Sequence, residues 1–353
     1  MYKTIGDRKR KWVGFLSGAG EKTMYIIETE EAAERANKRP LPWPGLINER
    51  IEWAYEAYNQ KLAQAEWLPD DSLPVLSPYT GTEIFAEAFG CRVSYPGNDM
   101  PFALPKYRSS AEAASMKVPE VHDTPLGSLF EIARRLRQKA GPDAILQLPD
   151  IQSPLDIAAL ILEKEAFYIA MSEEPQVIRE LTAKTKALLT AFLDEWFKEF
   201  GASYAAHFPA YYMEGGVTLS EDEIGAFSPD MFNEYVLGAL NEMSERYGGI
   251  GIHCCAFSER QWPNLLNVKG LRLLNLVRDS RFIRRSLSYF GDAAAHWPME
   301  LSPASASGPD WFSACPDGVR VVLTYKAEDR AEALGLSAAA EDICAGRRER
   351  AGV

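Results

Sequence analysis

Short apolar runs alternate with longer segments of helical periodicity from residue 73 onwards. A run ends, a loop follows, and a Ser or Thr beside a Pro then opens a helix that stops at a Gly. We expect strands over residues 73–78, 144–149, 203–208, 249–255, 271–277 and 319–325. Strands that alternate with helices of this length form parallel βαβ units, so the pattern predicts a single (β/α)8 TIM barrel over residues 73–335.

An open doubly wound sheet is the alternative architecture. It is disfavoured because no glycine-rich dinucleotide motif follows any expected strand. The expected helices begin at Thr124, Ser153 and Ser228, each followed by Pro, and a longer helix runs from Pro175 to Gly201. The helix that begins at Ser228 is expected to continue to Gly248.

The segments outside the repeated pattern predict other structures. Residues 1–72 predict an N-terminal helical extension, because apolar residues recur at helical spacing after residue 50. Residues 301–310 read as a small polar loop. Residues 336–353 form a C-terminal tail rich in Ala and Arg, for which we expect a frayed helix or disorder.

Composition narrows the class of protein. The chain has 353 residues, 46% of them hydrophobic and 25% charged, which is enough to bury a full core. The net charge of −12 argues against a nucleic-acid partner, because phosphate contacts need a basic surface. No run approaches the roughly 20 apolar residues of a membrane span. Five cysteines, two of them adjacent, do not resemble a disulfide framework, so we expect a cytoplasmic protein.

The segment from Gly249 to Cys255 carries the most informative chemistry. Side chains alternate along a strand, so His253 and Cys255 share one face and Cys254 points to the other. An imidazole and a thiolate together suit zinc. A catalytic zinc normally has three protein ligands, and Glu214, Asp222 or His296 could complete the set. The alternative is a buried His that is hydrogen-bonded to the backbone beside two inert thiols.

Further candidates follow the expected strands and therefore belong to the same rim of the barrel, where TIM barrels carry their active sites. Asp150 could act as a general acid or base or accept a substrate hydrogen bond, although Asp in this position also serves turns. Tyr211 and Tyr212 could stack on a flat ligand or pack in the core. Arg278 could bind carboxylates together with nearby arginines, or these could form a solvated helix face. The candidates on this rim are Asp150, Tyr211, Tyr212, Asp222, His253, Cys255, Asn275 and Arg278.

Three ordered segments resemble the uroporphyrinogen decarboxylase superfamily. Gly81–Cys91 (GTEIFAEAFGC) is similar to its "aeaFGc" segment, and Asp222 followed by Ser228-Pro229-Asp230-Met231-Phe232 is similar to its "D…SPemF" segment. Ile252–Cys255 followed by Val268–Leu271 resembles its "HCcG…ipGl" region. The resemblance covers roughly residues 40–335 and implies a single (β/α)8 barrel.

This resemblance implies one of two chemistries. Decarboxylases of the superfamily act on tetrapyrrole acetate groups without a cofactor, whereas its zinc methyltransferases pass a methyl group between a corrinoid protein and a thiol. The methyltransferases carry H-x-C plus a distant Cys; His253 and Cys255 match the first two. The segment Arg39–Gly45 keeps a Pro and a Trp of the decarboxylase N-terminal motif but not its arginine pair. The corrinoid motif D-x-H-x-x-G is absent, so a corrinoid would arrive on a partner protein.

Three hypotheses follow. The leading one is a methyltransferase in which zinc on His253 and Cys255 activates a thiol. The second is a cofactor-free decarboxylase, in which Asp150 or Asp222 holds pyrrole-type donors and the arginines from Arg278 to Arg285 hold carboxylates. The third is a non-catalytic protein that binds a corrinoid or tetrapyrrole. We expect a small-molecule substrate and no membrane partner, and a homodimer is compatible with the sequence.

Overall fold

A sheet of parallel strands forms the centre of the molecule. The computed structural model describes residues 3–97, 99–300 and 315–351. The strands follow the order β1-β13-β11-β10-β9-β8, with β12 also paired to β10, and every pairing is parallel. Their bounds are β1 (Thr23–Thr29), β8 (Val217–Ser220), β9 (Ile250–Cys254), β10 (Leu271–Arg278), β11 (Ala295–His296), β12 (Met299–Glu300) and β13 (Val321–Ala327).

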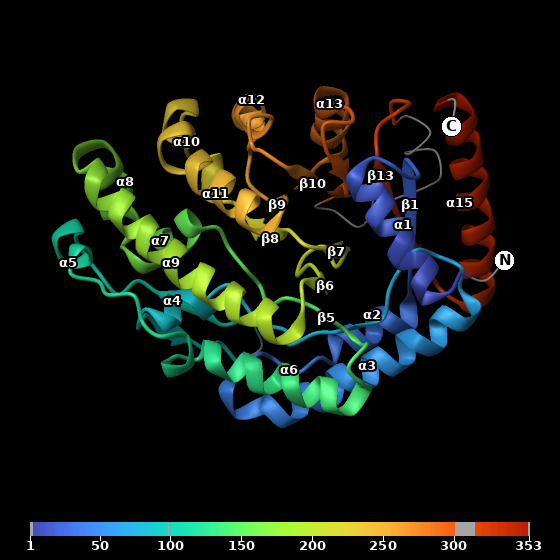
Figure 1. The fold of residues 1–353 in the computed structure, drawn as a ribbon, viewed down its shortest axis with the longest axis horizontal. Helices are drawn as coiled ribbons and strands as arrows, with labels where there is room; N and C mark the ends of the chain where they lie inside the picture. The colour runs from blue at the N-terminus through green and yellow to red at the C-terminus, as the bar shows by residue number, and fades with distance from the viewer. Residues whose placement is uncertain (1–2, 98, 301–314, 352–353) are drawn as a thin grey trace.

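Shorter strands continue this arrangement. β2 (Val75–Leu76) pairs in parallel with β5 (Ile145–Leu146), and Gln147 bridges in parallel to Ala205 at the end of β6 (Ser203–Ala205). A further parallel bridge joins Gln152 to Ser220 at the end of β8. Two antiparallel pairs lie outside the series, β3 (Arg92–Ser94) with β4 (Phe102–Leu104) and β6 with β7 (Tyr212–Glu214). The helices surround the strands in Figure 1, so the predicted TIM-barrel architecture is confirmed.

The helices occupy most of the segments where the sequence predicts them. Ser153 and Ser228 accept hydrogen bonds at the N-caps of their helices, as the Ser-Pro pairs indicate. The helix predicted from Ser228 to Gly248 is divided at Val236 into two helices. The helices are α1 (Ile5–Ser17), α2 (Glu30–Asn37), α3 (Ile47–Trp67), α4 (Ile84–Ala88), α5 (Ser110–Ala114), α6 (Leu126–Ala140), α7 (Pro154–Ile161), α8 (Lys164–Glu173), α9 (Pro175–Phe200), α10 (Pro229–Tyr235), α11 (Leu237–Tyr247), α12 (Trp262–Leu265), α13 (Ser280–Phe290) and α15 (Arg330–Ala351).

The helices predicted in the front segment are present, but a strand that the sequence analysis did not predict lies among them. β1 lies within residues 1–72 and pairs along its whole length with β13. Its short apolar run is not preceded by a Ser-Pro signal, so the sequence pattern did not reveal it. Two buried carboxylates hold the strand in place: Asp70 accepts the Ile27 N–H at 3.0 Å and Asp71 accepts the Tyr25 N–H at 3.0 Å.

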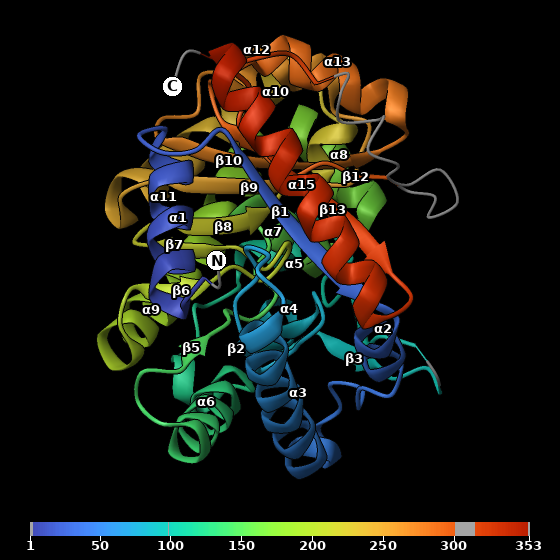
Figure 2. The same ribbon diagram turned by 90° about the vertical axis from the view of Figure 1, so that its right-hand side faces the viewer.

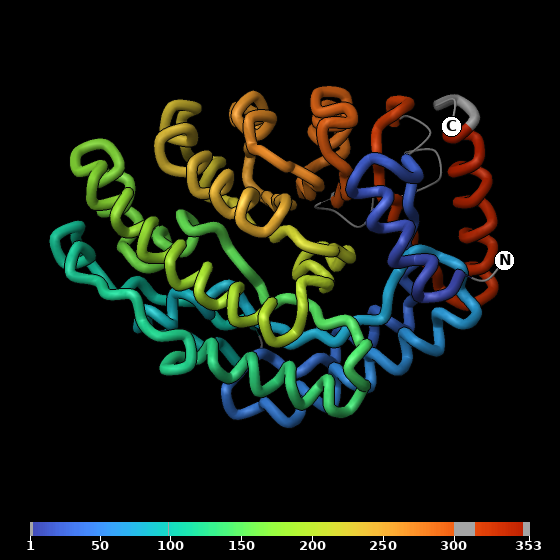
Figure 3. Tube along the Cα trace, viewed as in Figure 1, coloured from blue at the N-terminus to red at the C-terminus, as the bar shows by residue number. Residues whose placement is uncertain are grey.

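The tail is an ordered helix rather than a frayed one. α15 packs across β1 and β13, as Figure 2 shows, and its Ala340, Cys344 and Arg347 are buried. Arg347 donates a hydrogen bond to the Thr23 hydroxyl at 3.0 Å, which joins the helix to the start of β1. Figure 3 shows the two ends of the described chain on the same side of the molecule. Division of the chain at residues 72 and 335 stays a prediction, and the loop predicted at 301–310 lies outside the described residues.

Aromatic side chains fill the interior beside the first half of β9. Trp12 of α1 stacks on Trp297 with ring centroids 5.7 Å apart and lies 6.2 Å from the Tyr211 ring. Gly251 is required at this point, because a Cβ there would come within 1.8 Å of the Tyr211 hydroxyl oxygen. Where the structure describes the chain, none of its helices is long and apolar enough to cross a membrane.

Candidate metal centre

Three potential metal ligands converge at the carboxyl ends of β8 and β9. One ligand atom from each of Asp222, His253 and Cys255 lies within 4.8 Å of the other two. Ser220 is paired with His253 in the sheet, so the two strands end at the same level. This end of the barrel strands is where TIM-barrel enzymes place their chemistry. Within the described residues this is the one such group of three. Of the three candidates for a third ligand that the sequence left open, the structure brings Asp222 to His253 and Cys255.

Asn275 fixes the orientation of the His253 ring. Its side-chain N–H group donates to the Trp297 carbonyl at 2.6 Å, which turns its amide oxygen toward His253. That oxygen lies 2.5 Å from His253 Nδ1, so Nδ1 must carry the proton and donate it. His253 Nε2 is therefore left with the lone pair that a metal needs. Asn275, one of the candidates predicted on this rim, is fully buried and contacts His253, and its role toward a substrate stays a prediction.

Asp222 and Cys255 are also joined directly. The Asp222 Oδ1 atom accepts a hydrogen bond from the Cys255 backbone N–H at 2.5 Å, which leaves Oδ2 able to face a metal. Burial and the neighbouring Asp222 carboxylate raise the pKa of the Cys255 thiol to about 12. The positive charge of Arg278 opposes this rise in the pKa of Cys255. Cys254 is buried on the opposite face, as strand alternation predicts.

Two buried acids lie directly behind the metal ligands, and the sequence analysis missed both. Asp156 in α7 is 2% exposed, and Glu221 is fully buried beside it. Burial is the largest cause that raises the pKa of Asp156 to about 7 and that of Glu221 well above its ordinary value. Asp156 adds to this rise in the pKa of Glu221, whereas the Ser153 side chain opposes it. We therefore expect Glu221 to be the protonated member of the pair, with its proton shared toward Asp156.

Asp150 lies on the same rim but not in the metal set. Its carboxylate is 3.1 Å from His207 Nε2, and its backbone N–H donates to Thr80 at 2.8 Å. The neighbouring Phe208 ring meets the His253 ring edge-on at a centroid distance of 5.1 Å. The sequence analysis did not single out His207, because one His in a loop has no partner at recognisable spacing. The catalytic role of Asp150 stays a prediction.

The two tyrosines are not brought to the metal centre. Tyr211 is fully buried against Trp12, and its hydroxyl forms a hydrogen bond with Thr218 at 2.5 Å. Tyr212 is also buried and donates to Glu214 at 2.9 Å. This burial favours the core-packing alternative over a substrate contact. Glu214 is occupied by this hydrogen bond and is outside the metal set.

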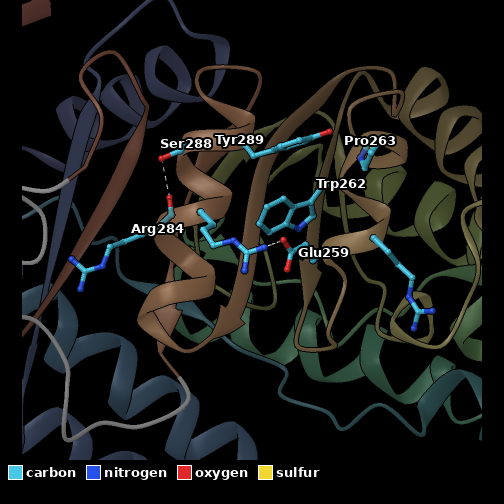
Figure 4. Close-up of a pocket in the computed structure, with 8 residues that line it drawn as sticks. Glu259, Trp262, Pro263, Arg284, Ser288 and Tyr289 are labelled. Atoms are coloured by element: carbon cyan, nitrogen blue, oxygen red, sulfur yellow. Dashed lines mark hydrogen bonds and ion pairs between the residues drawn. The ribbon is translucent and has the colours of Figure 1, made fainter.

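Arg278 differs from the arginines that follow it. It lies over the Phe257 ring at 5.0 Å, close to Cys255. Arg281, Arg284 and Arg285 are on the exposed face of α13. An outer groove of about 630 Å³ lies between α12 and α13. Figure 4 shows this groove, with Arg284 extending away from Trp262. Arg285 forms an ion pair with Glu259 there, so this face matches the solvated-helix alternative.

The remaining His and Cys candidates serve the core. Burial lowers the pKa of His296 to about 4, and its Nε2 lies 3.2 Å from the Gly291 carbonyl oxygen. Cys91, Cys315 and Cys344 are buried and lie outside the metal set. The distant cysteine of the methyltransferase motif therefore has no counterpart at this centre among the described residues, where the third potential ligand is the Asp222 carboxylate.

The comparisons agree with this fold. The model for the uroporphyrinogen decarboxylase (URO-D) family matches residues 78–276, more than half of the chain. The chain therefore belongs to the uroporphyrinogen decarboxylase family, which supports an enzyme on a TIM-barrel-like fold.

Among solved structures, a methyltransferase from Methanosarcina mazei has the same fold, with a TM-score of 0.67 at 14% identity over 96% of this chain and 99% of that chain. A protein described as a vitamin-B12-independent methionine synthase from Listeria monocytogenes gives a TM-score of 0.48 at 11% identity, over 91% of this chain and 96% of that chain. No curated protein matches the sequence.

Proposed function

We propose that the protein is a zinc-dependent methyltransferase that moves a methyl group between a corrinoid carried by a partner protein and a thiol. The observation that carries this proposal is the convergence of Asp222, His253 and Cys255 at the active rim. The methyltransferase named for the Methanosarcina mazei structure and the H-x-C pattern of the sequence point in the same direction.

The donor set fits zinc better than the common alternatives. Magnesium and calcium prefer oxygen ligands, whereas zinc accepts imidazole, thiolate and carboxylate together. Three protein ligands are typical of catalytic zinc, which keeps a further position for water or substrate. Bound there, zinc would lower the pKa of a coordinated thiol and so supply a thiolate nucleophile at neutral pH.

The surrounding residues have definable roles in this proposal. Asn275 holds the proton of His253 on Nδ1, which keeps Nε2 free to bind. Arg278 lies close to Cys255 and offsets the negative charge that two anionic ligands concentrate at the rim. Asp150, paired with His207 beside the Phe208 ring, lies where it could contact the remainder of a bound thiol.

The deciding experiment measures zinc in purified protein. We expect about one zinc per chain in the parent, and strong loss of zinc in His253→Ala and Cys255→Ala because each removes one of three protein ligands. Cys254→Ala is the matched control, because it removes an adjacent thiol that points away from the site. Retention of zinc by His253→Ala, or a parent protein that binds none after zinc is supplied, would refute the proposal.

A transfer assay then tests the reaction. Parent protein with zinc should demethylate methylcobalamin in the presence of a thiol, followed by the change in corrinoid absorbance, and Cys255→Ala should not. Because the chain belongs to the uroporphyrinogen decarboxylase family, decarboxylation is the alternative activity to test. Release of carbon dioxide from uroporphyrinogen by metal-free protein, with no methyl transfer, would favour that activity.

A further inference from the structure

The backbone that carries Asp222 is held by a second aspartate, Asp156. Asp222 is the N-cap of the short 3-10 helix Glu223–Gly225. An Asp at an N-cap ordinarily uses its own carboxylate to accept the first free backbone N–H groups of the helix. Asp222 makes no such bond. Its Oδ1 instead accepts from the Cys255 backbone N–H, and the carboxylate belongs to the metal set.

Asp156 accepts the two backbone N–H groups at the start of this helix, those of Asp222 and Glu223. Its Oδ2 accepts from the Asp222 N–H at 2.6 Å and its Oδ1 from the Glu223 N–H at 3.1 Å. Both carboxylate oxygens are thus used on a segment that is distant in sequence. The contact joins the first turn of α7 to the loop that carries Asp222.

The local sequence around Asp156 would ordinarily lead to a different contact. Ser153 caps α7 and accepts the Asp156 N–H at 3.1 Å, which is half of a capping box. In a complete box the carboxylate three residues later would accept the N–H of the cap residue. Here the Ser153 N–H donates to the Ser220 carbonyl at 2.8 Å, so the Asp156 carboxylate is left for the Asp222 loop.

We infer that Asp156 is a positioning residue of the metal centre, which holds the backbone of Asp222 and Glu223 and thereby fixes the Asp222 carboxylate beside His253 and Cys255. This inference rests on the proposed zinc site. Without Asp156, the N–H groups of Asp222 and Glu223 would lack their acceptor, so the loop would shift and the Asp222 carboxylate would lose its place in the metal set. Metal would then be held by His253 and Cys255 alone.

The test compares zinc affinity in four folded proteins: the parent, Asp156→Ala, Asp222→Ala and the double variant. Competition with a fluorescent chelator gives the affinity. We expect Asp156→Ala to weaken zinc binding by about 10- to 100-fold, the usual cost of removing a partner that orients a ligand. In the Asp222→Ala background, Asp156→Ala should not weaken zinc binding further, because the ligand that Asp156 positions is already absent. Asp156→Asn keeps one acceptor oxygen and should lose less affinity, and it carries the test if Asp156→Ala does not fold.

A spectroscopic readout and a control separate positioning from general damage. In cobalt-substituted protein, Asp156→Ala should shift the d–d bands as Asp222→Ala does, while the thiolate charge-transfer band of Cys255 persists. Ser228→Ala removes the N-cap at the other end of the same loop, so it should lower the urea midpoint and leave zinc affinity unchanged.

Each of the following outcomes overturns the inference: parent affinity in folded Asp156→Ala, additive losses in the double variant, or an equal loss of affinity in Ser228→Ala. Normal zinc binding by Asp222→Ala would overturn this inference but would leave the proposed function standing. Failure of the parent to bind zinc would instead refute the proposed function, and the inference with it.

Discussion

In the proposed site, the Cys255 thiol carries the proton that a bound zinc ion would displace. The pKa of Cys255 is raised from 9.0 to about 12, first by burial and then by Asp222. The residue is partly exposed, so solvent screening reduces this effect. Even a thiol pKa midway between the two values leaves about nine thiols in ten protonated at pH 9.5, whereas an ordinary thiol would be about three-quarters ionised.

Zinc binding at pH 9.5 should therefore release about one proton per chain, against about a quarter of a proton for an ordinary thiol. Between pH 7.5 and 9.5 the apparent affinity should rise about tenfold per pH unit, because each zinc displaces one proton. The number of protons released per zinc is measured by calorimetry with chelator-buffered zinc, from the change in binding enthalpy between buffers of different ionisation heat. Cys255→Ala should abolish the release and Cys254→Ala should not change it. Release of less than half a proton at pH 9.5 from the parent would refute the reasoning.

Three further predictions concern the protein around the site. Burial raises the pKa of Glu83 from 4.5 to about 7, so the folded state holds the Glu83 proton more tightly than the unfolded state does. The free energy of unfolding therefore falls as the pH rises from 4.5 to about 7. In urea unfolding, Glu83→Gln should be as stable as the parent at pH 4 and more stable at pH 8, by at most about 3 kcal/mol. Gly251→Ala should cost about 2 kcal/mol of stability in thermal unfolding, because its Cβ would clash with Tyr211, whereas Gly238→Ala in α11, with open space around it, should not destabilise. Asn275→Ala should weaken zinc binding about 10- to 100-fold by releasing the His253 ring, and unchanged affinity would contradict the assigned ring orientation.

The sequence predicts the barrel and two of the three residues of the metal set, for reasons that are local. Strand alternation places His253 and Cys255 on one face because the period of two is a property of the backbone. Asp222 could be listed but not chosen, because its approach to Cys255 depends on how two separate strands end. Asp156 gave no signal at all, since its partners lie in another loop and its own surroundings read as an ordinary helix start.

β1 was missed for a related physical reason. Its apolar run is short, and its partner β13 lies at the opposite end of the chain, so no local pattern reveals the pairing. The burial of α15 likewise comes from its contact with these two strands and not from its own periodicity. Asn275 was placed on the correct strand, but its hydrogen bond to His253 could not be predicted, because alternation does not tell which side chain of the neighbouring strand it meets.

The pairing of β1 with β13 also has a consequence for biosynthesis. β1 leaves the ribosome long before β13 and α15. All residues of β1 from Thr23 to Thr29 pair with β13, and α15 covers the strand. Until both have emerged, this apolar strand keeps an open edge that can pair with other chains. Contacts between such distant segments also slow folding. The nascent chain should therefore depend on chaperones for longer than a barrel whose first strand is covered by its immediate neighbours.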